Sequence, residues 1–366
     1  MPSADLTAAG LLFADDPQPE FVDVNGTTAA VSLQENNGIL VIPDVTNPPA
    51  ELTDANVFTA GTTDFSEGTG IDPSNEDGGI DINPEPILGL NQPDGHDLVL
   101  IDGVAYVVTA NEGDGRGDDP FVDGGDIARG DDLLTLENPL SEGDPLLDPT
   151  IFDEAFQDRL NDDADLGRLE FSVIDGDTDG DGDIDQLHAF GGRSFSIFNV
   201  ATGEEVFNSG TEIEFLTSQL VPEIFNSDES DPDEFDDRSD DGGPEPEGVV
   251  VGQVGDTIYA FVGLERVGGV MVYDITDPAN ATFDQYIPAQ IGDGPVNAGP
   301  EGLEFIPAED SPTGQALLVV SAEDSSTLAV YTIEDGRNFQ LVSAVQGSTA
   351  AGDGDRTVGV DDISPL

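Results

Sequence analysis

The feature that most constrains the fold is a short pattern that recurs four times along the chain. Each copy begins with a proline and an acidic residue, continues as an apolar strand, and is followed by a second strand that ends in glutamate. The copies begin at Pro19-Glu20, Pro93-Asp94, Pro246-Glu247 and Pro300-Glu301, and their second strands end at Glu35, Glu112, Glu265 and Glu323. A unit of this length cannot bury its apolar faces alone, so neighbouring units must stack. The repeat therefore predicts a β-propeller, in which antiparallel sheets are arranged radially.

Further strands complete these units. A third strand follows in three of them, at residues 38–42, 269–275 and 327–333. A divergent unit without the proline has residues 187–190 and 194–199 as a predicted hairpin. An ordinary β-sandwich is the alternative fold, but it does not explain why an acid recurs at the same two places of each unit.

We therefore expect an all-β fold, a single β-propeller domain over residues 1–366 with about five blade-like units. Gly/Asp/Pro-rich stretches at 61–92 and 113–148 predict long acidic loops, and residues 148–168 predict one short amphipathic helix. The predicted units span about 19–92, 93–140, 171–244, 246–298 and 299–366, with an insertion at 141–170.

Charge excludes several classes of function. The chain has 78 acidic and 9 basic residues, for a formal net charge of −69, and all the basic residues are arginine. A nucleic-acid-binding surface, a P-loop lysine and a lysine Schiff base are thereby excluded. The chain has no cysteine, which excludes disulfides and thiolate metal sites, and it has no apolar run of 18 residues that predicts a membrane-spanning helix.

The net charge also predicts that the protein works at high salt concentration. Mutual repulsion of so many carboxylates is largely screened only near 1 M salt, where the Debye length falls to about 3 Å. We therefore expect a halophilic protein, with a marine or calcium-rich surface protein as the alternative.

One loop has the spacing of a calcium site. With Asp177 as position 1, Asp179 and Asp181 occupy positions 3 and 5, Asp183 supplies a backbone carbonyl at position 7, and Asp185 stands at position 9. Alternate acids on a tight loop bring hard oxygen ligands to one point, as Ca²⁺ requires. The sequence predicts a Ca²⁺ site here; a merely solvated acidic loop is the alternative.

Two other sets of acids are candidate cation ligands. The first is Asp236, Asp237 and Asp240, a possible second ion site or a solvated charge run. The second is the pair of acids in each repeat, which a propeller would bring to one mouth of its channel as a carboxylate ring. The alternative, which we favour from the sequence, is that each acid hydrogen-bonds the backbone of the neighbouring blade. The possible channel carboxylates are Glu20, Glu35, Asp94, Glu112, Glu247, Glu265, Glu301 and Glu323.

Several motifs carry a family resemblance. They are Leu33-Gln34-Glu35-Asn36-Asn37, Thr109-Ala110-Asn111-Glu112, Gly191-Gly192-Arg193-Ser194, Pro244-Glu245-Pro246-Glu247, Gly263-Leu264-Glu265-Arg266 and Gly299-Pro300-Glu301-Gly302. Over about 19–333 the chain resembles the choice-of-anchor I domain family. The resemblance implies a secreted or surface-anchored, seven-bladed, YVTN-like propeller related to mesenchyme-specific cell surface glycoproteins. Because fewer units are recognisable here, we expect that the N-terminal blades are missing, which would also explain the absence of a signal peptide.

Two functions follow as expectations. The first is an extracellular or cell-surface β-propeller that binds calcium and an unidentified surface or extracellular partner. The second is a metal-dependent phosphoesterase of the alkaline phosphatase or phytase type, because some family members carry a phosphatase label. Arg193 and Arg266 would then bind phosphate. No catalytic residue can be named, since His96 and His188 are the only histidines and neither lies in a known catalytic motif.

Overall fold

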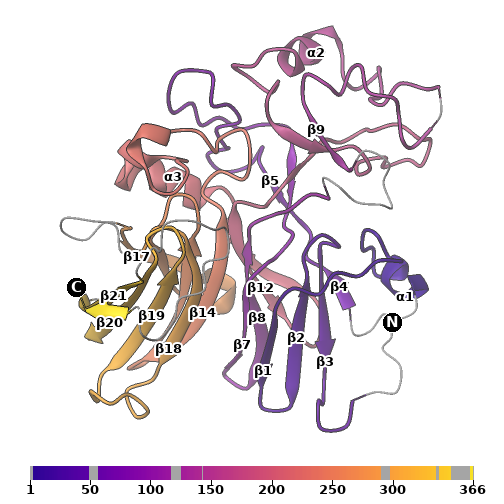
Figure 1. The fold of residues 1–366 in the computed structure, drawn as a ribbon. Helices are drawn as coiled ribbons and strands as arrows, with labels where there is room; N and C mark the ends of the chain where they lie inside the picture. The colour runs from indigo at the N-terminus through magenta and orange to yellow at the C-terminus, as the bar shows by residue number, and fades with distance from the viewer. Residues whose placement is uncertain are drawn as a thin grey trace.

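The computed structural model describes residues 3–48, 57–116, 125–141, 143–289, 297–334, 338–347 and 363–365. The described residues are mostly β, as predicted, and they form five sheets of four or five strands with few, short helices (Figure 1). No helix in this part of the chain is long and apolar enough to cross a membrane.

Four antiparallel sheets are built from the repeated units. The first contains β1 (Val22–Asn25), β2 (Thr28–Leu33), β3 (Gly38–Ile42) and β4 (Val57–Thr59). The second contains β7 (His96–Ile101), β8 (Val104–Asn111), β12 (Ser194–Asn199) and β13 (Glu205–Asn208). The third contains β14 (Pro246–Val254), β15 (Thr257–Leu264), β16 (Val270–Asp274) and β17 (Thr282–Ile287). The fourth contains β18 (Pro300–Ile306), β19 (Ala316–Ala322), β20 (Thr327–Glu334), β21 (Asn338–Gly347) and β22 (Ile363–Pro365).

Turn chemistry explains why these strands pair with their sequence neighbours. Asp102 and Gly103 join β7 to β8 with φ angles of 51° and 80°. Two consecutive positive φ values are those of a type I′ turn, whose twist matches that of antiparallel strands. The hairpin register is thereby set locally, with Ile101 opposite Val104.

The first strands of the four repeated sheets lie next to one another in chain order, since β1 contacts β7, β7 contacts β14, and β14 contacts β18. The same kind of hydrogen bond occurs at two of these junctions: a backbone N–H of one sheet donates to an aspartate of the preceding sheet. The Leu98 N–H donates to Asp23 Oδ2 at 2.8 Å, and the Val251 N–H donates to Asp97 Oδ2 at 2.6 Å. Both aspartates stand four residues after the proline of the repeat. An acid of the repeat therefore clamps neighbouring sheets, but it is not the acid that follows the proline.

The fifth sheet is built from two inserted segments, one between β4 and β7 and the other between β8 and β12. It consists of β5 (Thr62–Asp64), β6 (Leu88–Leu90), β11 (His188–Phe190), β10 (Glu170–Ser172) and β9 (Ile127–Arg129), in that order. The predicted hairpin of 187–190 with 194–199 is therefore wrong. Strand β11 pairs with β6 and β10, whereas β12 pairs with β8 and completes the second repeated sheet. The reason is burial, because Phe195 and Ile197 pack with Val108 and Ala110 of β8.

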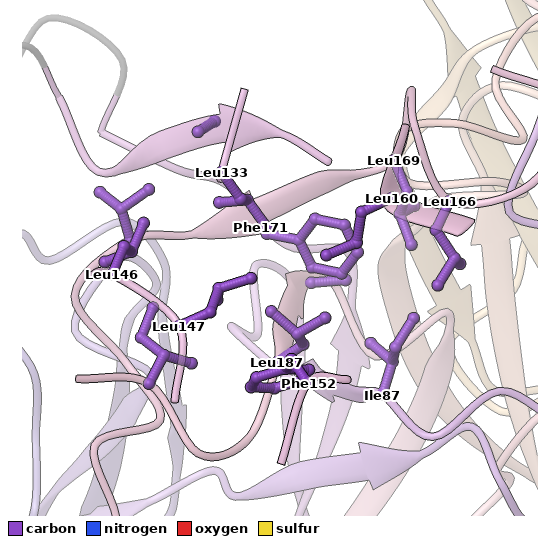
Figure 2. Packing of buried hydrophobic residues seen from close by; sticks show 14 of the residues in the cluster. Ile87, Leu133, Leu146, Leu147, Phe152, Leu160, Leu166, Leu169, Phe171 and Leu187 are labelled. Carbon is purple, nitrogen blue, oxygen red and sulfur yellow. The ribbon is translucent and has the colours of Figure 1, made fainter. Parts of the chain in front are cut away.

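The insertion has its own hydrophobic core, although its sequence predicted long acidic loops. Figure 2 shows Ile87, Leu133, Leu147, Phe171 and Leu187 converging from separate segments. Burying each such side chain contributes roughly 1.5–3 kcal/mol, so these segments form a folded layer rather than a set of mobile loops. Figure 1 places this layer, with β9, beyond the ends of the repeated strands.

Three α-helices and three 3₁₀ turns complete the described structure. Within the predicted helical region 148–168, only α2 (Glu154–Leu160) is helical, and Asp153 caps it by accepting from two backbone N–H groups. The sequence did not predict α1 (Ser3–Ala8) or α3 (Glu212–Leu220). The short turns are η2 (Pro222–Ile224), η3 (Pro232–Glu234) and η4 (Pro278–Asn280).

Candidate metal sites

The predicted calcium loop lies between β10 and β11, and it is folded around Asp177. Asp177 Oδ1 accepts from the N–H groups of Gly180 at 2.7 Å and Asp181 at 3.1 Å, and its Oδ2 accepts from Gly182 at 3.0 Å. Gly182 has a φ of 99°, a backbone conformation that side-chain-bearing residues rarely adopt. Asp177 therefore organises the start of the loop, and Gly182 allows the turn that follows.

Two groups of carboxylates converge in this loop. Asp177, Asp179 and Asp185 each place one oxygen within 4.8 Å of the others, and so do Asp148, Asp183 and Asp185. Asp185 belongs to both groups, whereas Asp181 belongs to neither. Asp183 takes part through its side chain, whereas the spacing predicted its backbone carbonyl.

Asp148 is a ligand candidate that the sequence did not reveal. It precedes α2, far from the loop along the chain, and its N–H donates to the Ile184 carbonyl at 3.0 Å. The parallel bridge of Leu147 with Ile184 brings it there. The only sequence signal for this contact was the pair of apolar residues Leu146 and Leu147, which are buried in the core of the insertion.

The charges of this loop repel one another. Asp181, followed by burial and by Asp185, raises the pKa of Asp179, whereas burial, followed by Asp181 and Asp148, raises the pKa of Asp183 to about 6. In contrast, hydrogen bonds from the side chain and backbone of Thr178 lower the pKa of Asp185. A cation bound among these groups would relieve the repulsion.

A second site lies where the inserted sheet meets the ends of the repeated strands. There a cavity of about 590 Å³ is lined by carboxylates, by Arg129, Arg238 and Arg266, and by the rings of Phe21 and Phe190. We call it the central cavity. The repeat places the acids there, because one acid precedes or begins each first strand and another follows each second strand.

All eight predicted channel carboxylates belong to one group of interacting charges in and around the central cavity. Four of them line it, namely Glu20, Asp94, Glu112 and Glu247. The negative charges of the other four raise the pKa values of neighbouring acids. Glu35 raises the pKa of Asp94, Glu265 and Glu301 raise that of Glu247, and Glu323 raises that of Glu301. The structure thus places members of both sets of repeat acids near one another, and the carboxylate ring stays a prediction.

Burial raises the pKa values of three of the acids that line the central cavity. Burial, followed by the charges of Glu265 and Asp94, raises the pKa of Glu247 to about 9. Burial, followed by Glu20 and Asp114, raises the pKa of Asp94 to about 7. The pKa of Glu112 is also raised well above its usual value, by burial and then by Glu247. Glu247 therefore holds a proton at neutral pH.

Glu245 is the exception in the central cavity, and the sequence did not single it out as a site residue. Its Oε1 and Oε2 accept from Arg238 Nη2 at 2.7 Å and Arg266 Nε at 2.8 Å. Burial opposes ionisation of Glu245, but the two guanidiniums outweigh it and hold its pKa below the usual value. Glu112, Glu245 and Glu265 have oxygens within 4.8 Å of one another, so they form a third group that can hold a metal ion.

Arg193 does not line the central cavity, so its predicted role as a phosphate ligand is wrong. Its side chain is 1% exposed, and Nη1 pairs with Glu214 Oε2 at 2.9 Å. The guanidinium also donates to the carbonyls of Asp72, Ser239 and Asp241. Both terminal nitrogens of the guanidinium therefore donate inside the fold, and they are not directed at a bound phosphate.

Arg266 does line the central cavity, but carboxylates already surround it. It forms ion pairs with Asp228 at 3.3 Å, Glu245 at 2.8 Å and Glu265 at 3.1 Å. A phosphate would have to compete with these anions.

The predicted acidic site at Asp236, Asp237 and Asp240 is not assembled as one ligand set. Asp240 pairs with Arg129 at 2.7 Å and with Arg168 at 2.9 Å, Asp236 accepts from Ser239, and Asp237 is exposed. None of the three-carboxylate groups found among the described residues contains them.

The comparisons with known proteins agree with the sequence motifs. The profile of the choice-of-anchor I domain matches residues 2–278. Gigasin-3a from Magallana gigas is 32% identical over 187 residues, which are 47% of this chain and 66% of that protein. The mesenchyme-specific cell surface glycoprotein of Strongylocentrotus purpuratus is 26% identical over 312 residues, which are 78% of this chain and 37% of that protein. The chain therefore spans less than two thirds of the length of each of these relatives.

Similarity to solved structures is weak. A functionally unknown protein from Desulfotomaculum acetoxidans aligns with a TM-score of 0.33 and 11% identity over 89% of this chain and 69% of that one. A putative 6-phosphogluconolactonase from Bacteroides fragilis aligns with a TM-score of 0.29 and 14% identity over 89% of this chain and 69% of that one.

Proposed function

The chain belongs to the choice-of-anchor I domain family, and from this premise we propose that it is a secreted or cell-surface β-propeller module that binds Ca²⁺. A surface location is supported by the similarity to a cell surface glycoprotein. The net charge of −69 supports work in high salt, where solvated carboxylates keep a protein soluble. The partner at the surface would be another extracellular component.

The propeller is supported by how the repeated sheets meet. Their first strands are neighbours in chain order, and two junctions use the same aspartate position of the repeat. Radial stacking produces this arrangement, because each sheet then contacts the next through equivalent positions.

The observation that carries calcium binding is the convergence of Asp177, Asp179 and Asp185 on a loop already turned by Asp177 and Gly182. Hard carboxylate oxygens on a tight loop suit Ca²⁺, which takes six to eight oxygen ligands. Mg²⁺ suits the loop less, because it requires a smaller octahedral shell and retains its waters.

Calcium-dependent stabilisation tests this proposal. We expect millimolar CaCl₂ to raise the Tm in molar KCl relative to EDTA, because the ion binds the folded loop. Asp177→Asn combined with Asp185→Asn should remove most of this rise, and millimolar MgCl₂ should replace Ca²⁺ poorly. Asp237→Asn, a change at an exposed aspartate, is the control and should keep the rise. If the double variant keeps the full calcium response, the loop is only a solvated turn.

A second candidate function, metal-dependent phosphoester hydrolysis, is favoured by the central cavity. There the Glu112, Glu245 and Glu265 carboxylates converge beside Arg266. A metal ion held by such carboxylates can activate water and bind a phosphate oxygen. Hydrolysis of 4-nitrophenyl phosphate in molar KCl that requires Ca²⁺ and is lost in Glu265→Gln would support this function. Absence of turnover by the unaltered chain would exclude it for this substrate.

A further inference from the structure

A fully buried cluster of acids lies apart from both sites described above. It consists of Asp72 from the insertion, Glu214 of α3, and Asp236 from the segment before β14, with exposures of 0%, 0% and 3%. Three segments that are distant in sequence thus contribute one carboxylate each. We call it the buried acid cluster.

The buried acid cluster has fewer cationic partners than acids. Among the described residues, the cation bonded to it is Arg193, which pairs with Glu214 at 2.9 Å and donates to the Asp72 carbonyl. Three carboxylates and one guanidinium leave two negative charges inside the protein. Burying uncompensated charge is unfavourable, so these charges must be removed by protons or balanced by a cation.

Asn226 supplies an independent sign of a missing ligand. Its side chain is 0% exposed, and its Nδ2 donates to Glu214 Oε1 at 3.2 Å and to Ser239 Oγ at 2.9 Å. Ser239 Oγ in turn donates to Asp236 Oδ1 at 2.6 Å. The amide therefore lies between the two acids, yet its Oδ1 accepts no hydrogen bond from any described residue. Buried carbonyl oxygens rarely remain unpaired.

We propose that the buried acid cluster binds one divalent cation of the Ca²⁺ type, with Asp72, Asp236 and the Asn226 carbonyl oxygen among its ligands. Carboxylate and amide oxygens are the ligands that Ca²⁺ takes in proteins. A bound water would satisfy Asn226 but would not balance the charge. A divalent ion does both, and it would tie the insertion to α3 and to the segment before β14.

Two observations bear on how the ion would bind. The oxygens of these acids do not form one of the groups within 4.8 Å, so binding requires the side chains to move closer together. Burial, with the charges of Glu214 and Asp236, raises the pKa of Asp72 to about 8, although a hydrogen bond from the Asp81 N–H acts in the opposite direction. Burial, with the charges of Asp77 and Glu214, raises the pKa of Asp236 to about 7, although the hydrogen bond from Ser239 lowers it. At neutral pH protons thus remove the charge only in part, and a cation would displace them.

The test uses the chain with Asp177→Asn and Asp185→Asn, so that its outcome does not depend on the calcium loop. After equilibration with CaCl₂ in molar KCl and gel filtration, bound calcium is counted per chain by elemental analysis. We expect Asp236→Asn in this background to bind one ion fewer than its parent and to lose the smaller calcium-dependent rise in Tm that remains in the parent. Asp237→Asn, its exposed neighbour, should change neither.

A second variant shows whether the loss of calcium in Asp236→Asn is caused by misfolding. Asp72→Asn replaces an acid that another segment contributes to the buried acid cluster, and it should lose the same ion. Both variants should be at least as stable as the parent in EDTA, because each removes a buried repulsive charge. The proposal is overturned if calcium stoichiometry is unchanged in both variants, or if both lower the Tm equally in EDTA and in CaCl₂, since the acids then act only as hydrogen-bond acceptors.

Discussion

Replacing Arg193 distinguishes a structural arginine from a phosphate ligand. In Arg193→Met the Glu214 carboxylate stays buried without its partner at 2.9 Å, and breaking a buried ion pair in this way costs about 3–5 kcal/mol. Three backbone carbonyls also lose a donor, those of Asp72, Ser239 and Asp241. Because each unsatisfied buried group costs about 1–3 kcal/mol and such terms are not additive, we expect a loss of at least about 4 kcal/mol.

The assay is equilibrium unfolding in urea, followed by circular dichroism in molar KCl. Arg193→Met combined with Glu214→Gln should be less destabilised than Arg193→Met alone, because the uncompensated charge is gone while a carbonyl acceptor remains. Arg168→Met is the matched control, since Arg168 is 36% exposed and pairs with Asp240. We expect that control to lose no more than about 1 kcal/mol. A loss below about 1 kcal/mol for Arg193→Met would refute the structural interpretation.

Two further predictions concern salt and pH. Because the net charge of −69 is screened only at high ionic strength, we expect cooperative folding in molar KCl or NaCl and loss of β-sheet circular dichroism below roughly 0.2 M salt; an unchanged Tm between these conditions would contradict the halophilic interpretation. The raised pKa values of Glu247, about 9, and Asp94, about 7, mean that the folded chain binds more protons than the unfolded chain above pH 4. The free energy of unfolding in EDTA should therefore fall as pH rises from 5 to 9, by at most about 1.4 kcal/mol per pH unit and group, and Glu247→Gln should flatten the curve. A profile that rises over this interval would show that these acids are stabilised as anions.

The arginines show how this acidic chain uses its few cations. Three arginines bind the segment before β14. Arg129 and Arg168 form ion pairs with Asp240, and Arg193 donates hydrogen bonds to the Ser239 and Asp241 carbonyls. Arg129 belongs to β9 of the inserted sheet, whereas Arg193 directly precedes β12 of the second repeated sheet. The charge run that suggested an ion site is therefore, in large part, a binding surface for the protein's own arginines.

The sequence by itself determined the features that depend on neighbouring residues. Strand positions, hairpin turns such as Asp102-Gly103, and the fold of the Asp177 loop arise from backbone and side-chain contacts within a few residues. The repeat also placed an acid at equivalent strand ends, so that the convergence of Glu112, Glu247 and their counterparts could be expected. These features were predictable because local hydrogen bonding and alternation of apolar residues are visible in the chain itself.

Only the tertiary structure decided which distant segments meet. Strand β12 pairs with β8 and not with its sequence neighbour β11, the Leu147 bridge brings Asp148 to the Asp177 loop, and Arg193 is buried against Glu214. It also decided that Asp23 and Asp97, rather than the acids beside the prolines, clamp neighbouring sheets. The physical reason is that these contacts depend on burial. Apolar faces pack against the surface that removes most of their area from water, and that surface can lie anywhere in the chain. A charged side chain is buried only where a partner of opposite charge or a hydrogen-bonding group is buried with it.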